Sequence, residues 1–182
     1  MEKLEILNLA GNKISDINNL ENVNFKQLKE LILYSNKISD IKVLEKVKFD
    51  KLEKLNLSEN EILDINNLEN ANFKELKELN LNYNKISDIK VLEKVKFEKL
   101  EKLNLSMNQI SDINNLENVN FRELKELDLS FNKISDIKVL KKVKFDKLEK
   151  LNLRVNQISD INNLENVNFK ELKELNLHYN KI

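Results

Sequence analysis

The sequence predicts an α/β solenoid, a right-handed β-α superhelix with a parallel concave sheet and short helices on its convex side. Three observations lead to this prediction. Equivalent leucines recur every 24 positions without insertion, as from Leu4 to Leu28. Within each unit, two further leucines alternate with polar residues, which is the pattern of a strand with one buried face. The segment that follows carries apolar residues at three-residue spacing, which suits a short, tight helix.

The repeat covers essentially the whole chain. We expect one domain over residues 1–182, made of eight such units with the last unit truncated. The units begin at Leu4, Leu28, Leu52, Leu76, Leu100, Leu124, Leu148 and Leu172. Positions within a unit are counted from this leucine as position one. Identical strands separated by a return segment must lie parallel and side by side, so the repeat predicts a curved stack of units.

The return segment contains the signals of a helix start and of a second core layer. Asp16 is expected to cap a tight helix of one or two turns over residues 17–22. Phe25 and its equivalents are then expected to fill the convex layer of the core. Two kinds of unit alternate along the chain, so the full period of the sequence is a pair of units.

Each unit opens with one motif. In the third unit, Leu52, Leu55, Leu57, Asn60 and Ile62 give the pattern LxxLxLxxNxI. This pattern resembles the leucine-rich-repeat signature, and eight tandem copies make the resemblance specific. The continuations NKISDI and NQISDI resemble the short repeats of internalin-like and phosphatase-regulator-like proteins, although the unit here is longer than theirs. The resemblance implies a solenoid.

An asparagine stands at position nine of every unit, where the strand must turn inward. The column consists of Asn12, Asn36, Asn60, Asn84, Asn108, Asn132, Asn156 and Asn180. An amide side chain both donates and accepts hydrogen bonds, and buried polar groups are almost always paired. We therefore expect an internal asparagine ladder that satisfies backbone groups of the turns, rather than a ligand site.

Charged residues alternate in sign from unit to unit. At position two the column runs Glu5, Lys29, Glu53, Lys77, Glu101, Lys125, Glu149 and Lys173. Position three and the two positions before each first leucine alternate in the same way, which accounts for the formal net charge of zero. We expect each charge to face an opposite charge on both neighbouring strands and so to fix the order of the units. Carboxylates with lysine neighbours on an open face are not expected to act as general acids.

The composition excludes several classes of function. The chain has no cysteine, one glycine and a single histidine, His178. These counts leave no thiol nucleophile, no phosphate-binding glycine loop and no metal-ligand set, so we expect no enzyme activity, no cofactor and no metal. Zero net charge argues against nucleic acid and against a membrane surface as partners. No secretion signal is apparent, which predicts a cytoplasmic protein, or an extracellular one if the chain is an excerpt of a secreted protein.

The positions that vary between units predict where a partner binds. Positions seven and eight are both expected to face outward at one rim of the concave sheet. Five consecutive position-eight residues are apolar: Tyr83, Met107, Phe131, Val155 and Tyr179. Exposed apolar residues with aromatic anchors are typical of protein interfaces, and we predict a partner site here. The alternative is that these side chains only stack along the rim and cover the asparagine ladder.

Other features carry weaker expectations. Asp128 interrupts a run of asparagines at position five and is interpreted as a simple exchange of Asn for Asp, with a role beside Arg154 in the polar specificity of the partner site as the alternative. Ile6, Ile32 and Tyr34 form a second apolar cluster, interpreted as a capping feature. The lysine-rich segment 138–144 is interpreted as a solvated face, with an acidic partner as the alternative.

These observations predict a non-enzymatic module that binds a protein or peptide partner on its concave face and rim. The alternative function is a structural or idealised repeat segment without a specific ligand. The first and last units of the stack carry no visible cap over the core. This favours either flanking repeats or head-to-tail self-association of the chain.

Overall fold

The computed structural model of the chain describes residues 2–182, in which eight short parallel strands form one open sheet. Each strand pairs with the next one along the chain, and the paired residues are 24 positions apart, as in Leu55 and Leu79. The strands are β1 (Ile6–Asn8), β2 (Glu30–Ile32), β3 (Lys54–Asn56), β4 (Glu78–Asn80), β5 (Lys102–Asn104), β6 (Glu126–Asp128), β7 (Lys150–Asn152) and β8 (Glu174–Asn176).

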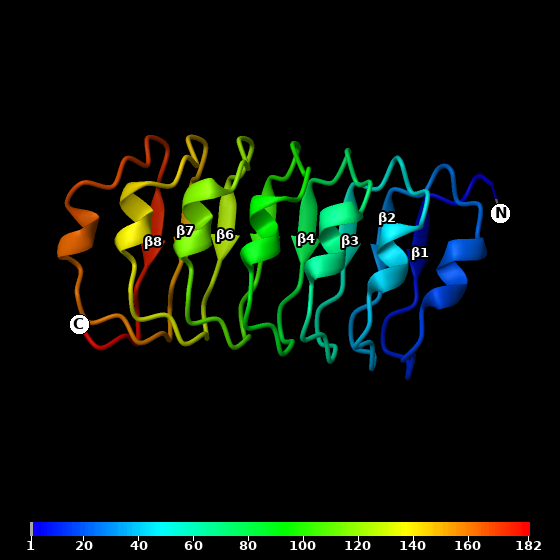
Figure 1. The fold of residues 1–182 in the computed structure, drawn as a ribbon, viewed down its shortest axis with the longest axis horizontal. Helices are drawn as coiled ribbons and strands as arrows, with labels where there is room; N and C mark the ends of the chain where they lie inside the picture. Colours follow the sequence, from blue (N-terminus) through cyan, green and yellow to red (C-terminus); the bar gives the residue numbers. More distant parts are fainter. Residues whose placement is uncertain (1) are drawn as a thin grey trace.

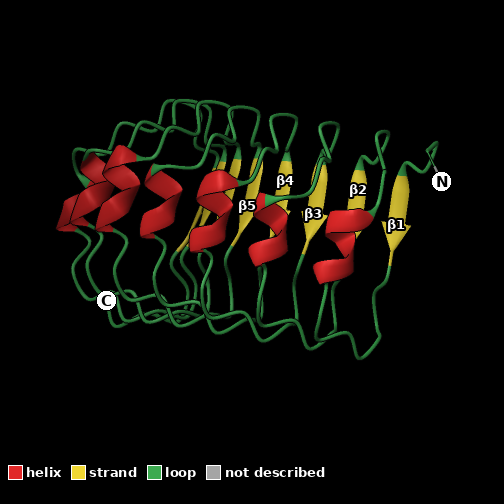
Figure 2. Ribbon diagram, turned by 45° about the vertical axis from the view of Figure 1, so that its right-hand side comes forward, coloured by secondary structure: helices red, strands yellow, loops and turns green. Residues whose placement is uncertain are grey.

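In residues 2–182, seven short helices lie on the opposite side of the stack from the sheet (Figures 1 and 2). All are 3-10 helices, namely η1 (Asn18–Asn22), η2 (Lys42–Glu45), η3 (Asn66–Asn70), η4 (Lys90–Glu93), η5 (Asn114–Asn118), η6 (Lys138–Lys141) and η7 (Asn162–Leu164). In Figure 1 the row of helices is longer than the row of strands, so the sheet lies on the inside of the curve. The predicted solenoid, with its parallel sheet and short helices, is confirmed.

The first helix begins one residue later than the sequence predicts. Ile17 is the capping residue of η1 and makes no capping bond with its side chain. Asp16 instead accepts the backbone N–H of Asn18 on its Oδ1 at 2.7 Å. The aspartate thus stabilises a turn just ahead of the helix, because its short side chain reaches an N–H two residues on.

The core consists of aliphatic side chains in columns that run the length of the stack. Leu31 and Leu33 are fully buried beneath the sheet. The predicted phenylalanine layer lies on the helical side, where Phe25 stacks on Phe49 with ring centroids 6.3 Å apart. A leucine at the last strand, Leu175, is 36% exposed, because no further unit of the described chain covers it. Burial therefore comes from neighbouring units, as expected for a repeat stack.

The charge columns form ion pairs, with a difference from the expectation. At position two, Lys77 lies 2.7 Å from Glu53 of the preceding unit, and no ion pair links it to the glutamate of the following unit in residues 2–182. At position three, Lys54 reaches both neighbours, at 3.9 Å to Glu30 and 3.7 Å to Glu78. In residues 2–182, two-sided pairing thus occurs at Lys54, whereas a position-two lysine directs its one ammonium group to a single partner.

Candidate interaction surface

Each strand ends in a turn that the side chain at position five organises. In the fifth unit, Oδ1 of Asn104 accepts the backbone N–H of Ser106 at 3.0 Å and its hydroxyl at 2.7 Å. The same pair of bonds joins Asn56 to Ser58. The prediction that position seven faces outward is wrong at these serines, since Ser106 is only 6% exposed. The hydroxyl turns inward because it has an acceptor there.

The asparagine ladder lies directly beneath this turn and links neighbouring units. Oδ1 of Asn108 accepts the N–H of Ile86 at 2.9 Å, and Nδ2 donates to the carbonyls of Leu81, Leu105 and Ser106 at 3.0 to 3.1 Å. Equivalent bonds recur along the stack, so the predicted ladder is confirmed. Buried amides therefore hold the turns of adjacent units at one fixed spacing.

Position eight adopts a left-handed backbone in every unit. Gly11 has φ of 67°, and the other seven residues have φ between 52° and 57° although none is glycine. This conformation costs an ordinary L-residue about 1–2 kcal/mol, and it is least suited to a β-branched residue such as Val155, at 52°. The sequence thus places bulky apolar side chains where glycine or asparagine fits most easily.

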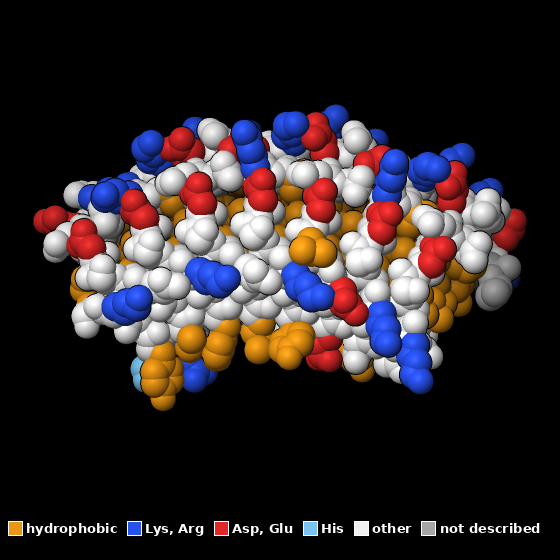
Figure 3. Space-filling model, turned by 60° about the horizontal axis from the view of Figure 1, so that its bottom comes forward, with side chains coloured by type: hydrophobic (Ala, Val, Ile, Leu, Met, Phe, Trp, Pro, Cys, Tyr) orange, Lys and Arg blue, Asp and Glu red, His pale blue; other side chains and the backbone are white. Residues whose placement is uncertain are grey.

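These position-eight side chains form an exposed apolar row, which we call the rim stripe: Tyr83, Met107, Phe131, Val155 and Tyr179. Tyr83 is 55% exposed and Tyr179 is 65% exposed, and Val155 is half-buried. Figure 3 shows hydrophobic side chains along one edge of the molecule, next to a row of lysines. The structure brings the five predicted residues together as one continuous surface feature.

Arg154 joins the rim stripe through contacts that the sequence did not reveal. Its guanidinium carbon lies 5.4 Å from the ring centre of Phe131 and 5.3 Å from that of Tyr179. Within residues 2–182 its buried Nε has no hydrogen-bond partner, and the guanidinium takes part in no ion pair. A cation between two aromatic rings is held in place by attraction to both ring faces.

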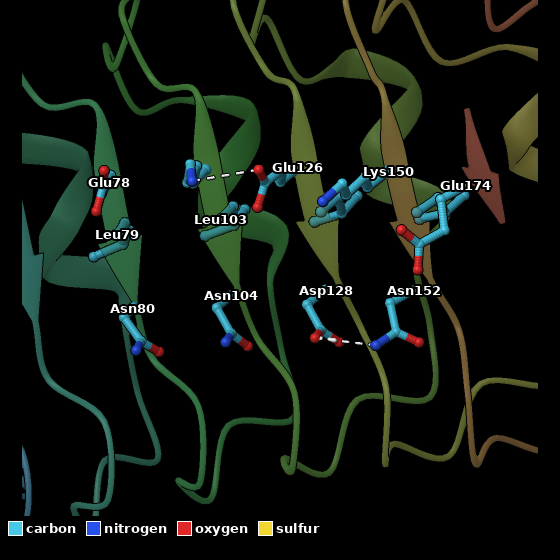
Figure 4. Close-up of a pocket in the computed structure, with 13 residues that line it drawn as sticks. Glu78, Leu79, Asn80, Leu103, Asn104, Glu126, Asp128, Lys150, Asn152 and Glu174 are labelled. Carbon is cyan, nitrogen blue, oxygen red and sulfur yellow. Dashed lines mark hydrogen bonds and ion pairs between the residues drawn. The ribbon is translucent and has the colours of Figure 1, made fainter. Parts of the chain in front are cut away.

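Asp128 takes the place of the position-five asparagine in its turn. Its Oδ1 accepts the N–H of Ser130 at 2.8 Å and the hydroxyl at 2.6 Å, while Oδ2 accepts Nδ2 of Asn152 at 3.1 Å (Figure 4). It forms no ion pair with Arg154 in the described chain. Asp128 thus makes the turn bonds that asparagine makes in the other units, and its role in polar specificity beside Arg154 stays a prediction.

The exposed face of the sheet forms an open hollow over strands β4 to β8. Its volume is about 360 Å³, and residues of positions three to five line it. Lys102 and Glu126 form an ion pair across its floor at 3.3 Å (Figure 4). On the adjacent column, a hydrogen bond from Lys77 lowers the pKa of Glu53 below its ordinary value of 4.5. The hollow is lined by four acidic residues and two basic ones, so acidic side chains outnumber basic ones on this part of the concave face: Glu78, Glu126, Asp128 and Glu174 against Lys102 and Lys150.

The other features predicted from the sequence do not belong to the rim stripe. Ile6 and Tyr34 are exposed at the first two units, at 53% and 40%. In the lysine-rich segment 138–144, Lys142 pairs with Glu117 at 2.7 Å and the side chains of the other lysines are exposed. No group of three or more His, Cys, Asp or Glu side chains in residues 2–182 is placed to hold a metal ion. Nor does the described part contain a helix with the length and apolarity to cross a membrane.

Comparison with known proteins identifies the family. A family model described as Leucine Rich repeats (2 copies) matches residues 2–46, 50–94, 74–118, 98–142 and 122–166. The chain belongs to the leucine-rich-repeat family. Proteins of this family generally mediate protein–protein interactions and are typically non-enzymatic. A comparison with curated proteins finds no match.

Solved leucine-rich-repeat structures share the fold. Internalin C2 of Listeria monocytogenes is 26% identical, with a TM-score of 0.78 over 97% of this chain and 72% of that one. A leucine-rich-repeat protein of Leptospira interrogans is 27% identical, with a TM-score of 0.79 over 100% of this chain and 44% of that one. The plant peptide hormone receptor RGFR1 is 22% identical, with a TM-score of 0.69 over 97% of this chain and 28% of that one. This chain thus spans less than half of the latter two proteins.

Proposed function

We propose that this leucine-rich-repeat chain is a non-enzymatic recognition module that binds a protein or peptide on its rim stripe and the adjoining concave face. One observation carries the proposal. Bulky apolar side chains occupy a left-handed backbone position at which they are also exposed, as at Tyr83 and Phe131. A surface of this kind, with aromatic anchors and a polar border, is typical of protein interfaces.

Energetics supports this proposal over a purely structural role. The turn needs only a left-handed residue, which Gly11 provides in the first unit. Tyrosine or phenylalanine there adds backbone strain of about 1–2 kcal/mol and leaves apolar surface in water. Strain at exposed positions is commonly retained where function requires the side chain. Binding of a partner would bury the same surface and offset this cost.

The shared fold agrees with such a role. The plant receptor of the same fold was solved in complex with RGF2. In the present chain, the units that line the hollow over strands β4 to β8 at positions three to five also supply the rim stripe at position eight. A peptide could therefore contact both surfaces at once.

The second candidate is a structural repeat segment whose rim only packs on itself. The contacts of Arg154 with Phe131 and Tyr179 favour it, because they cover part of the rim stripe from within the chain. The two candidates differ in one respect. Only the recognition module requires the apolar side chains to bind something outside the chain.

A displayed library of random peptides tests this difference. The bait is the wild-type chain, compared with a chain carrying Tyr83→Ser, Phe131→Ser and Tyr179→Ser. A control chain carries Lys138→Ser, Lys141→Ser and Lys144→Ser on the helical side. We expect peptides to be enriched on the wild type and on the control, and not on the rim variant.

Two outcomes would refute the proposed site. Peptides enriched equally on the wild type and the rim variant would place binding elsewhere. No enrichment on the wild type would favour the structural segment. Circular dichroism and urea unfolding of all three chains establish that each remains folded.

A further inference from the structure

Given the proposed function, on which this inference rests, we infer that the partner segment is acidic and apolar, with a carboxylate that pairs with Arg154. Apolar side chains of the same segment would lie on Phe131 and its neighbours in the rim stripe. The inference depends on the charge of the rim, on the geometry of Arg154 and on the lysines beside it.

The rim of the last five units is positively charged in a chain of zero net charge. Positions seven to ten of these units are residues 82–85, 106–109, 130–133, 154–157 and 178–181. They contain Lys85, Lys133, Arg154 and Lys181 and no acidic residue. The columns at positions two and three and just before each first leucine alternate in sign, whereas position thirteen is a uniform column of aspartates. The positive bias is therefore specific to positions seven to ten.

Few of these cations are neutralised within the chain. Lys85 pairs with Glu61 at 3.0 Å, whereas Lys133 and Lys181 are exposed and form no ion pair in residues 2–182. Figure 3 shows a row of acidic side chains beyond the row of basic ones. The position-thirteen aspartates accept backbone N–H groups and keep their negative charge, as Asp136 does from Lys138 at 2.8 Å. Within residues 2–182, the last three units therefore present cations without an ion pair beside apolar side chains: Lys133, Arg154 and Lys181.

Arg154 is prepared to receive a carboxylate. Its guanidinium carbon lies 5.4 Å from the ring centre of Phe131 and 5.3 Å from that of Tyr179. Its Nε is buried and has no hydrogen-bond partner within residues 2–182. The terminal N–H groups of a guanidinium point outward in its plane, where a carboxylate binds through two parallel hydrogen bonds. Because the side chain is already half-buried and held in place, pairing loses less side-chain entropy than at a free lysine.

Asp128, in the turn of the preceding unit, already has hydrogen-bond partners. Asp128 accepts hydrogen bonds from Ser130 and Asn152 and, in the described chain, forms no ion pair with Arg154. The complementary charge must therefore come from outside the described chain. Apolar side chains next to that acid would fit the rim stripe, whose consecutive members follow adjacent strands about 4.8 Å apart.

The test uses the peptides enriched on the wild-type chain in the random library. We expect an aspartate or glutamate flanked by apolar residues to recur among them. A synthetic peptide of that sequence and its amide counterpart, with Asp→Asn and Glu→Gln, are then titrated against three chains by fluorescence anisotropy. The chains are the wild type, Arg154→Met and the control Lys141→Met, which loses the same charge on the helical side.

The acidic peptide should bind Arg154→Met about tenfold more weakly than the wild type, and Lys141→Met as tightly as the wild type. The amide peptide should bind the wild type and Arg154→Met equally, which shows that the substitution leaves the apolar surface intact. Added salt should weaken the binding of the acidic peptide and leave that of the amide peptide unchanged.

The outcomes separate this inference from the proposed function. Enriched peptides without acidic residues would overturn the inference and leave the rim as a binding site. If Arg154→Met weakened the binding of the acidic and the amide peptide equally, the inference would also be overturned, because Arg154 would then contribute only packing contacts. Failure to enrich any peptide on the wild type would instead count against the proposed function.

Discussion

Replacement of Asn108 by alanine should destabilise the chain far more than the same change at Asn12. The interior side chain makes four hydrogen bonds, and its loss leaves the N–H of Ile86 buried without an acceptor. Such an unpaired group costs about 1–3 kcal/mol, and the two N–H groups of Nδ2, which are shared among three carbonyls, contribute about 0.5–1.5 kcal/mol each. The expected loss is therefore roughly 2–6 kcal/mol.

Asn12 is the matched control because it is exposed and bonds only within its own unit. Its Nδ2 donates to the carbonyls of Leu9 and Ala10 at 2.9 and 3.1 Å. Water can replace these bonds, so Asn12→Ala should cost less than about 1 kcal/mol. Urea unfolding followed by circular dichroism measures both variants. Equal losses, or a loss below about 1 kcal/mol at Asn108, would refute the ladder as a major source of stability.

Three further predictions concern the charge columns and the rim. Deletion of residues 76–99 sets like charges side by side, whereas deletion of 76–123 keeps the alternation. Only the first shortened chain should become more stable to urea when salt is added. The lowered pKa of Glu53 gives stability that is present above its ordinary value of 4.5 and is lost as the pH falls through the folded value. Lys77→Met should therefore reduce the loss of stability in acid, measured by urea midpoints across pH. Val155→Asn should raise the unfolding free energy by about 1 kcal/mol, because asparagine tolerates the left-handed backbone better. It should also weaken any peptide that binds the rim stripe, so that stability and affinity change in opposite directions.

The role of each repeat position in the fold could be predicted from the sequence, because eight units can be compared at that position. The leucine spacing indicated the parallel strands, and the chemistry of an amide at an inward turn indicated the role of Asn108. The charge alternation indicated the opposite signs on adjacent strands. Each of these follows from the residue type and its period alone.

The missed details depend on local geometry within one unit. The asparagines at position five, such as Asn56 and Asn104, suggest a polar outer face. Each of these two side chains instead accepts a hydrogen bond from the backbone N–H of the serine two residues later. That turn buries Ser106 and imposes the left-handed backbone at Met107. The constant spacing from position five to position seven was the signal that could have revealed it.

The candidate site was predicted as a row of side chains, and the structure places that row on one edge. The position of Arg154 could not be predicted, because a long side chain at position seven could extend in several directions. Its contacts with Phe131 and Tyr179 become visible only in the structure.

Fluorine NMR of the tyrosines tests the central claim most directly. The chain has three tyrosines, of which Tyr83 and Tyr179 belong to the rim stripe and Tyr34 lies outside it. All three are exposed, so incorporation of fluorotyrosine gives two reporters and one internal control. Titration with a peptide enriched on the wild-type chain should shift the resonances of Tyr83 and Tyr179 and leave that of Tyr34 in place. A shift of Tyr34 alone, or binding without a shift of either rim tyrosine, would contradict the assignment of the rim stripe as the binding surface.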